Sequence, residues 1–325
     1  WDVRTDRFEG GWTVEIQIPF KSLRYRPTST QVWGIQLRRI IRRRTEASYL
    51  TPLPISAARG NSVIAGLWRV SQAGSLVGIE VPSGSRKIEV KPYGISGVTT
   101  DINADPPTRN ALDGQFGLDV KYGVTQNLTA DFTYNTEFAQ VEVDEQRVNL
   151  TRFSLFFPEK REFFLEARGN FDFARGAGLG GAGAPTLFFS RRIGLQGGDV
   201  VPILAGGRLT GKIGAFDVGA LNIQTGNELL SGAQTTNFTV LRVKRDILRR
   251  STIGGIFTNR SVSLLGDGSN QVYGIDGRLA FFDDVTLLGY VARTRTADRP
   301  GRDASYLGQF DYAGDRYGVN LAHLV

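Results

Sequence analysis

Acidic side chains gather between residues 137 and 166, and their types and spacing could support acid–base chemistry. Two carboxylates that face each other across a cleft are the pair that glycoside hydrolysis needs, one as general acid and the other as base or nucleophile. The acidic residues of this segment are Glu142, Asp144, Glu145, Glu159, Glu162 and Glu166. One hypothesis is therefore a carbohydrate-processing hydrolase that uses the carboxylates of 142–166.

Basic residues in the same segment favour a structural role for these acids. The basic residues are Arg147, Arg152, Lys160 and Arg161, and paired phenylalanines such as Phe163 and Phe164 separate them. A charge that leaves water requires a partner, so acids and bases that fold inward together should neutralise one another. We therefore interpret the ten charged residues as one network of ion pairs, and we assign no catalytic residue.

The cysteine and histidine content of the chain excludes several other kinds of active site. The chain has no cysteine and one histidine, His323, which removes disulfides, thiol nucleophiles and sites built from several histidines. We expect His323 to line the interior or the rim of the fold, and we expect no metal and no cofactor. The glycine-rich segment 174–184 lacks the strand and helix that flank a dinucleotide-binding loop, so it is predicted to be a flexible loop.

Basic and aromatic residues of the first 85 positions suggest two further binding sites. Arg38, Arg39, Arg42, Arg43 and Arg44 form a basic run in a chain of net charge +7. Single-stranded nucleic acid also needs aromatic platforms between the basic residues, and these are scarce here, so we expect no nucleic-acid partner. Trp12, Trp33 and Trp68 could stack on a sugar ring, although tryptophan in an alternating strand more often packs into a core.

The sequence predicts that the secondary structure elements that position these residues are β-strands throughout. The 40 glycines and the alternation of apolar with polar residues predict an all-β protein with little helix, and no apolar run is long enough for a helical membrane span. Leu128, Phe132 and Tyr134, for example, alternate with Thr129 and Asp131. From residue 87 the expected strands are 87–98, 113–122, 127–135, 186–193, 201–213, 215–223, 236–245, 251–259, 271–282, 286–294, 304–312 and 316–323.

Three features favour an antiparallel transmembrane β-barrel over a soluble β-sandwich. Many of the strands have about nine residues or more, enough to cross a bilayer when tilted. The polar strand faces carry charges and glycine rather than a second apolar layer. Tyrosines fall near the expected strand ends, as in an interfacial girdle: Tyr93, Tyr122, Tyr134, Tyr273, Tyr290, Tyr306, Tyr312 and Tyr317. Segments 215–223 and 236–245 fit this pattern poorly because apolar residues occur on both faces.

Several segments resemble one family of bacterial envelope proteins. They are FAQVEVDEQRVNLTRFSLFFPEKREFFLE, PYGISG, GLDVKYGVTQNLTADFTYN and FFSRRIGL, and they closely resemble the DUF5916 family. Those proteins look like outer-membrane β-barrels with an N-terminal β-sandwich similar to carbohydrate-binding family 9. GWTVEIQIPFKSLRY and WGIQLRRIIRRRTEASYLTP resemble the tail of that sandwich.

The resemblance implies a domain plan and a location. Residues 1–85 would be the C-terminal part of the sandwich with a linker, and 86–325 an incomplete barrel, in which 137–184 forms a charged lumen or plug segment and a glycine-rich loop. The absence of methionine agrees with an interior piece of a longer protein. We therefore expect a protein in the outer membrane of a Gram-negative-type bacterium, with lipid and a glycan as partners, serving transport, export or anchoring. The hydrolase and a soluble β-sandwich adhesin remain alternatives.

Overall fold

The chain forms two compact units. The computed structural model describes residues 1–23, 25, 30–53, 67, 70–82, 88–102, 106–136, 157–174, 185–197, 199–229, 231–264, 267–282, 284–297, 301, 303–314 and 316–325. One unit comprises Trp1–Arg86 and Asp311–Val319, and the other comprises Lys87–Phe310 and Asn320–Val325. Strands dominate both, as the sequence predicts.

The first unit consists of strand pairs. β1 (Asp2–Phe8) pairs with β2 (Gly11–Gln17), β3 (Gln31–Ile35) with β6 (Gly74–Ile79), and β4 (Arg38–Ile41) with β5 (Glu46–Tyr49), all antiparallel. Single 3₁₀ turns cover Phe20–Ser22, Arg42–Arg44 and Val70–Gln72. The β-sandwich expected for residues 1–85 stays a prediction.

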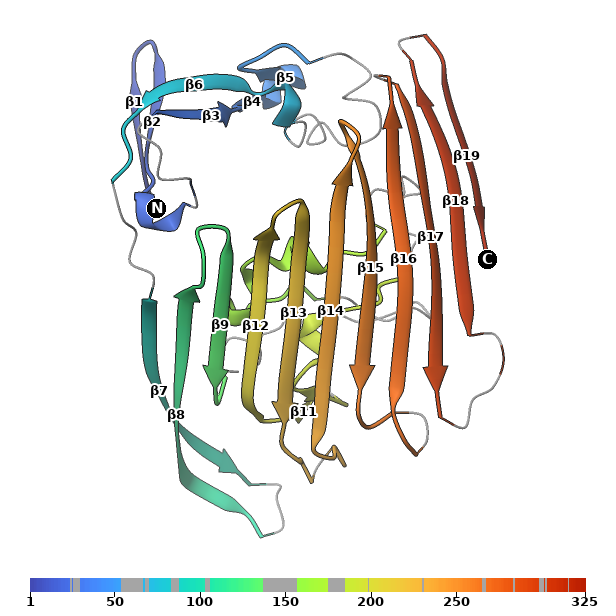
Figure 1. Ribbon diagram of the computed structural model, residues 1–325. Helices are drawn as coiled ribbons and strands as arrows, with labels where there is room; N and C mark the ends of the chain where they lie inside the picture. The colour runs from blue at the N-terminus through green and yellow to red at the C-terminus, as the bar shows by residue number, and fades with distance from the viewer. Residues whose placement is uncertain are drawn as a thin grey trace. The chain divides into compact units, whose positions relative to one another are not determined.

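Eleven of the described strands form one antiparallel sheet (Figure 1). Its order is β19-β18-β17-β16-β15-β14-β13-β12-β9-β8-β7, and no pairing of the described β7 with β19 closes it into a barrel. The bounds are β7 (Ile88–Asp101), β8 (Thr108–Gly123), β9 (Leu128–Tyr134), β12 (Ile203–Ile213), β13 (Phe216–Thr225), β14 (Thr236–Ile247), β15 (Ser251–Arg260), β16 (Asn270–Phe281), β17 (Val285–Thr296), β18 (Ala304–Ala313) and β19 (Gly318–Leu324).

Within this sheet, each strand pairs with the next strand in the sequence, except that an insertion separates β9 from β12. The described part of this insertion holds the one-turn helix α1 (Glu162–Leu165), 3₁₀ turns at Arg168–Phe171 and Ser190–Arg192, and the two-residue strands β10 (Leu195–Gln196) and β11 (Asp199–Val200). The strand predicted at 186–193 is therefore wrong. Its apolar residues contribute to packing instead, because Ile193 is buried and Phe188 packs against the core. Segments 215–223 and 236–245, which fitted poorly, are regular strands.

The two ends of the sheet differ in the length of their connections. At one end, the short-turn rim, the connections are 124–127, 214–215, 248–250, 282–284 and 314–317, of two to four residues each. Gly214, in the tightest of these, has a φ of 61°, which costs glycine little. At the other end, the long-loop rim, the connections are 102–107, 135–202, 226–235, 261–269 and 297–303, which have six residues or more.

The sheet buries one face, which carries both charged and apolar side chains, and leaves a largely apolar face exposed. Successive side chains of a strand point to opposite sides, so each strand contributes to a covered face, on which the insertion packs, and to an open face. Covered-face residues with little exposure include Thr129, Asp131, Thr133, Arg208, Thr210, Leu221, Ile223, Val240, Arg242, Ile256, Leu288 and Tyr290. Exposed open-face residues include Phe116, Phe132, Tyr134, Leu241, Val243, Ile253, Tyr273, Ile275, Val291, Tyr306 and Leu321. The alternation predicted for 127–135 is confirmed, and its polar side is buried, whereas on its apolar side Phe132 and Tyr134 are exposed and Leu128 is buried.

Two phenylalanines of the insertion rest on glycines of the covered face. A Cβ atom at Gly219 would lie 2.9 Å from the ring of Phe171, and one at Gly274 would lie 2.8 Å from the ring of Phe173. The ring of Phe173 also meets that of Tyr290 edge-on, with centroids 5.5 Å apart. Glycine is therefore required at these two strand positions because an aromatic ring occupies the space of a side chain.

We predict that Gly274→Val destabilises the fold, because the new side chain overlaps the ring of Phe173. Overpacking of this kind typically costs about 1–3 kcal/mol. Gly255→Val, on the open face of the adjacent strand, is the matched control, because its Cβ would meet only the carbonyl oxygen of Gly274 at 3.7 Å. Urea unfolding followed by circular dichroism measures both variants. Equal midpoints for the two variants would contradict the packing of Phe173 on Gly274.

Candidate functional site: the charged face beneath the insertion

Arg208 fastens the segment around α1 of the insertion to the covered face. Its guanidinium contacts the carboxylate of Asp131 on the adjacent strand, with Nη2 2.9 Å and Nε 3.2 Å from Oδ2. Nη1 donates to the backbone carbonyls of Phe163 and Glu166, the latter at 2.6 Å. The guanidinium carbon also lies 5.1 Å from the ring centroid of Phe163. One buried side chain thus satisfies a carboxylate and two carbonyl groups that have no strand partner.

Arg242, on β14, repeats this arrangement two strands away from Arg208 on β12. Its Nη2 lies 2.8 Å from Oδ2 of Asp276, its Nη1 lies 2.6 Å from Oδ1, and its Nε donates to the carbonyl of Asp172 at 3.1 Å. Asp276 also accepts the backbone N–H of Ala174 at 2.9 Å. The ring of Phe173 lies 5.6 Å from the Arg242 guanidinium carbon. Arg208 and Arg242 therefore hold two parts of the insertion against the sheet by the same chemistry.

A third buried pair joins Glu159 and Arg161 inside the insertion. The Glu159 carboxylate accepts hydrogen bonds from Arg161 Nε and Nη2, both 2.8 Å away, and from the hydroxyl of Ser190 at 2.7 Å. Arg161 in turn donates to the carbonyls of Ile193 at 2.7 Å and Ser190 at 2.9 Å. The ring of Phe164 lies 4.3 Å from the guanidinium carbon. Burial alone would raise the pKa of Glu159, but these donors outweigh it and hold the pKa below its ordinary value.

Two exposed ion pairs border this buried network. Lys91 of β7 pairs with Glu162, and Lys121 of β8 pairs with Glu166. A small cavity of about 50 Å³ lies between them, with Asp119 in its lining. Exposed pairs of this type contribute roughly 0–1 kcal/mol each, much less than a buried pair loses when one partner is removed. The buried arginines therefore dominate the attachment of the insertion.

The predicted charge network is found in part. Glu142, Asp144, Glu145, Arg147 and Arg152 lie outside the described residues. Of the others, Glu159 and Arg161 pair with each other, Lys160 donates its backbone N–H to Glu159 at 3.1 Å, and Glu162 and Glu166 pair with lysines of the sheet. The sequence reasoning missed Asp131, Arg208, Arg242 and Asp276. A detectable signal existed, because each is a charged residue on the polar side of an otherwise regular strand.

The tryptophans predicted to stack on sugars lie in different surroundings. Trp12, on β2, is about half exposed, and the Arg39 guanidinium carbon lies 5.5 Å from its ring centroid. Trp33, on β3, packs edge-on against Phe20 and donates its indole N–H to Gln31 at 3.0 Å. Trp68 lies outside the described residues. Of the two described tryptophans that were predicted to stack on sugars, Trp12 is therefore the better placed to contact a ligand.

The structure also places the arginine run, His323 and two of the tyrosines that were expected in the girdle. Arg38 and Arg39 lie on β4, whereas Arg42–Arg44 form a 3₁₀ turn. His323 is exposed on β19, with its ring centroid 5.8 Å from that of Tyr306, and its expected place in the interior or at the rim stays a prediction. Residues 175–184 of the glycine-rich segment lie outside the described residues. Two tyrosines expected in the girdle belong elsewhere: Tyr290 is buried against Phe173, and Tyr93 covers Gly117 on the covered face.

The described acids of the network are engaged rather than poised for catalysis. Glu159, Glu162 and Glu166 each form an ion pair with a neighbouring cation. Over the described part of the chain, no cluster of three His, Cys, Asp or Glu side chains could hold a metal ion. Nor does any helix of that part have the length and apolar character needed to cross a membrane. The chemistry that this arrangement supports best is attachment of one segment to a sheet.

The open face is bounded by aromatic side chains at both ends. Tyr122, Phe216 and Phe281 lie at the short-turn rim, and Tyr134, Tyr273 and Tyr306 lie at the long-loop rim. On β16, Tyr273 and Phe281 are eight residues apart, which is about 26 Å along the strand. In a membrane barrel whose strands tilt by about 40°, this length would span about 20 Å of depth, against an apolar band of roughly 25 Å.

We predict that Arg161→Met costs about 3–5 kcal/mol, because it leaves the Glu159 carboxylate buried without its partner. Lys91→Gln, which breaks an exposed pair with Glu162, is the control and should cost less than about 1 kcal/mol. Urea unfolding at neutral pH measures both costs. Equal costs for the two variants would contradict the dominance of the buried pair.

The buried pair of Glu159 and Arg161 predicts that the stability of the fold depends on pH. The folded-state pKa of Glu159 is lowered, so its contribution is fully present above the unfolded pKa of about 4.3 and is lost as pH falls through the folded pKa. The Glu159→Gln variant should therefore lose less stability than the wild type as the pH falls. An unchanged slope of stability against pH below 5 would contradict this.

Part of the chain matches a known protein family. The model of the family described as "Domain of unknown function (DUF5916)" matches residues 86–202, which include β7 to β9 and the insertion. No significant match was found among curated proteins. Residues 86–202 are thus similar to this family, and they contain Asp131, Arg161 and the carbonyl groups that Arg208 holds.

Proposed function

We propose that the eleven-stranded sheet is part of the wall of an outer-membrane β-barrel, with its open face towards lipid and its covered face towards the interior. The observation that carries this proposal is the uncovered apolar face of the sheet. Apolar side chains such as Leu241 and Ile275 lie exposed there, whereas Arg208 and Arg242 lie beneath the insertion together with an apolar core. Strands of membrane barrels alternate in this way, apolar outward and polar inward.

The size of the open face supports this proposal. Ten spacings of about 4.8 Å separate the edge strands, so the face is about 48 Å wide. With a height of about 20 Å between the aromatic rows, its area is on the order of 1,000 Å². The largest apolar patch of a typical soluble monomer covers only about 300–600 Å². Ile275 and Val291, near the middle of the face, are 70% and 62% exposed, so an apolar environment would remove a large cost of hydration.

The insertion would act as a plug within such a barrel. Its described residues lie on the covered face and are held there by Arg208 and Arg242. In wide barrels, polypeptide that folds into the lumen restricts the channel. The protein would then serve regulated uptake or export, or anchoring, rather than act as an open pore. The ion pairs of Glu159, Glu162 and Glu166 speak against the hydrolase, although the acids at 142–145 lie outside the described residues.

The unit that contains residues 1–86 would contribute a glycan contact. The support is the resemblance of its sequence to a carbohydrate-binding sandwich and the half-exposed ring of Trp12. An aromatic ring with one exposed side can stack on the apolar side of a sugar, and the adjacent Arg39 could donate to a hydroxyl or anionic group. Glycan binding at this position would complement transport or anchoring at the barrel.

The membrane proposal predicts that open-face positions contact lipid tails. Because the chain has no cysteine, single cysteines can carry a fluorophore at chosen positions. A fluorophore on Leu241→Cys, on the open face of β14, should be quenched by brominated lipid chains in reconstituted vesicles. Thr252→Cys, on the covered face of β15, is the matched control and should not be quenched. Fluorescence without quenching at Leu241→Cys, in protein that stays soluble without detergent, would instead support the soluble adhesin.

The glycan proposal predicts that Trp12→Ala weakens binding to polysaccharide without unfolding the unit. A stacking contact of this kind is worth on the order of 1 kcal/mol, so affinity should fall by about fivefold or more. Trp33→Ala is the contrasting variant and should destabilise the unit, because Trp33 packs against Phe20. Affinity electrophoresis through gels with and without polysaccharide gives the binding, and circular dichroism gives the fold. Equal retardation of the wild type and Trp12→Ala would refute a role for Trp12.

A further inference from the structure

Two arginines lie near each other at the long-loop rim of the covered face, and no acid of the described chain accompanies them. Arg260 is the last residue of β15, and Arg192 ends the 3₁₀ turn of the insertion at Ser190–Arg192. The charged group that acts on the Arg260 guanidinium is that of Arg192, with no acidic side chain of the described residues beside it. Neither arginine forms an ion pair with a described residue, whereas Arg208 and Arg242 each pair with an aspartate. The two positive charges therefore repel one another without a counter-charge from the described chain.

Uncharged groups hold Arg260 in its position. Its guanidinium carbon lies 5.3 Å from the ring centroid of Phe238, and its Nη2 donates to Oε1 of Gln196 at 3.2 Å. Gln196, on β10, in turn donates its side-chain N–H to the carbonyl oxygen of Ser231 at 3.2 Å. The β10–β11 hairpin, the 226–235 connection and the end of β15 thus meet at one junction. The position of the guanidinium is fixed there, but its charge is not neutralised.

Two buried polar atoms of this junction have no hydrogen-bond partner in the protein. They are Nε of Arg260 and the hydroxyl oxygen of Ser231. Both atoms carry a hydrogen that can be donated, and the side-chain amide of Gln196 contacts both residues. A buried donor that bonds to nothing costs free energy, and such groups in folded proteins are nearly always bonded to protein, water or an ion. Hydrogen-bond donors and positive charge are therefore both in excess at this junction.

The acids of the two adjoining loops do not provide the counter-charge. Asp199 lies opposite Gln196 in the register of the β10–β11 hairpin, but it is exposed and pairs with neither arginine. Glu228, in the 226–235 connection, forms no ion pair with Arg192 or Arg260 either. A partly buried cation beside a like charge is unfavourable until an anion joins it. Arg192 is exposed and Arg260 partly exposed, so an anion can reach them from solvent.

We propose that Arg192 and Arg260 bind a tetrahedral oxyanion, a phosphate or sulfate group, at this junction. A guanidinium presents its donors in a planar fork that matches two oxygen atoms of such a group. Two arginines together also match the double charge of these ions better than the single charge of a carboxylate or a chloride. The phenyl ring of Phe238 and the amide of Gln196 keep one fork in place before the ligand arrives, which lowers the entropy lost on binding.

The site itself does not depend on the membrane proposal. Arg192, Gln196, Ser231, Phe238 and Arg260 all belong to the compact unit Lys87–Phe310 with Asn320–Val325. In a barrel with the covered face inward, the site would lie in the interior near the long-loop rim, beside the insertion. An anionic solute, or a solute that carries a phosphate or sulfate group, would then be retained there. Only this last step rests on the proposed function.

Isothermal titration calorimetry of the purified protein, in a phosphate-free buffer of low ionic strength, tests this inference. The probes are inorganic phosphate, inorganic sulfate and glucose 6-phosphate, with chloride at the same ionic strength as the control. We expect phosphate and sulfate to bind at least about tenfold more tightly than chloride, because only an oxyanion can accept from two guanidinium forks at once. Tighter binding of inorganic phosphate would identify the free ion as the ligand, and tighter binding of glucose 6-phosphate would identify a phosphate group on a larger solute.

Three substitutions of arginine by glutamine separate the site from a general effect of charge. Arg192→Gln is the first variant, because Arg192 is exposed and its side chain bonds to no described residue, so the fold should accept it. Arg260→Gln is the second, and each should weaken phosphate binding by about tenfold or more through the loss of charge-assisted hydrogen bonds. Arg245→Gln, on the open face, is the matched control, because the Arg245 guanidinium carbon lies 5.2 Å from the ring centroid of Phe216. It removes the same charge and a similar ring contact, and should leave binding unchanged.

Arg192→Glu tests the missing counter-charge directly. An acid beside Arg260 should raise the melting temperature in phosphate-free buffer and abolish the further rise that phosphate causes in the wild type. Phosphate binding by the wild type that is no tighter than chloride binding would overturn the inference. Unchanged binding in both Arg192→Gln and Arg260→Gln, or a melting temperature of Arg192→Glu that still rises with phosphate, would do the same. Quenching of the fluorophore on Leu241→Cys decides the membrane proposal separately, because phosphate binding is measured without a bilayer.

Discussion

The rest of this structure depends on the need to satisfy charges and carbonyl groups that the sheet buries on its polar side. A buried guanidinium can serve a carboxylate and several carbonyls at once, and Arg208 and Arg242 both do so. Each joins a carboxylate on another strand to a part of the insertion that lacks ladder partners. Without these arginines the covered face would bury unpaired aspartates, and the backbone carbonyl groups of the insertion would lose their hydrogen-bond donors.

This constraint also gives the insertion one position. Apolar contacts between phenylalanines and a sheet are tolerant of small displacements, whereas a guanidinium that must reach both Asp131 and the carbonyl of Glu166 is not. The rings of Phe163 and Phe173 lie against the same arginines that hold the backbone. Packing and hydrogen bonding therefore specify the same arrangement, and an insertion held in this way would move only if several bonds broke together.

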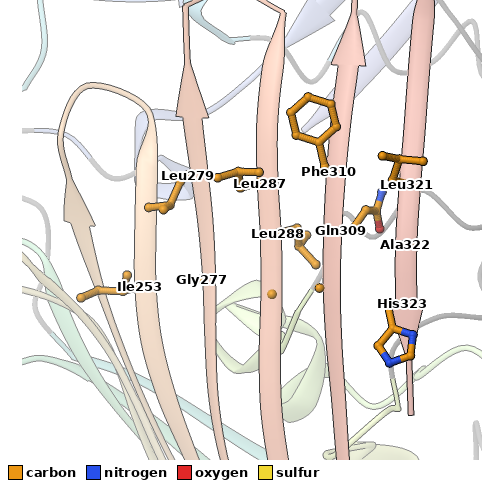
Figure 2. Close-up of a pocket in the computed structure, with 12 residues that line it drawn as sticks. Ile253, Gly277, Leu279, Leu287, Leu288, Gln309, Phe310, Leu321, Ala322 and His323 are labelled. Atoms are coloured by element: carbon orange, nitrogen blue, oxygen red, sulfur yellow. The ribbon is translucent and has the colours of Figure 1, made fainter.

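The glycines of the sheet show how one residue type takes two roles on opposite faces. Gly219 and Gly274 lie beneath the rings of Phe171 and Phe173, so the absent side chain is replaced by an aromatic ring. Gly277 and Gly308 lie on the open face, where no part of the described chain fills the space. The first kind contributes to the core, and the second kind leaves a shallow depression in the open face (Figure 2).

The sequence by itself determined the strands and their two-sided character, because side-chain alternation is a local property with a period of two residues. It predicted the acids of the insertion and some of their cations, such as Arg161 for Glu159. Only the tertiary structure decided which side of each strand is buried, since alternation is equally regular in either case. The partners of Glu162 and Glu166, the core position of Tyr290, and the irregular path of 186–193 were likewise decided by contacts between residues far apart in the chain. Such contacts arise from the register of the strands and the path of the insertion, which no local pattern encodes.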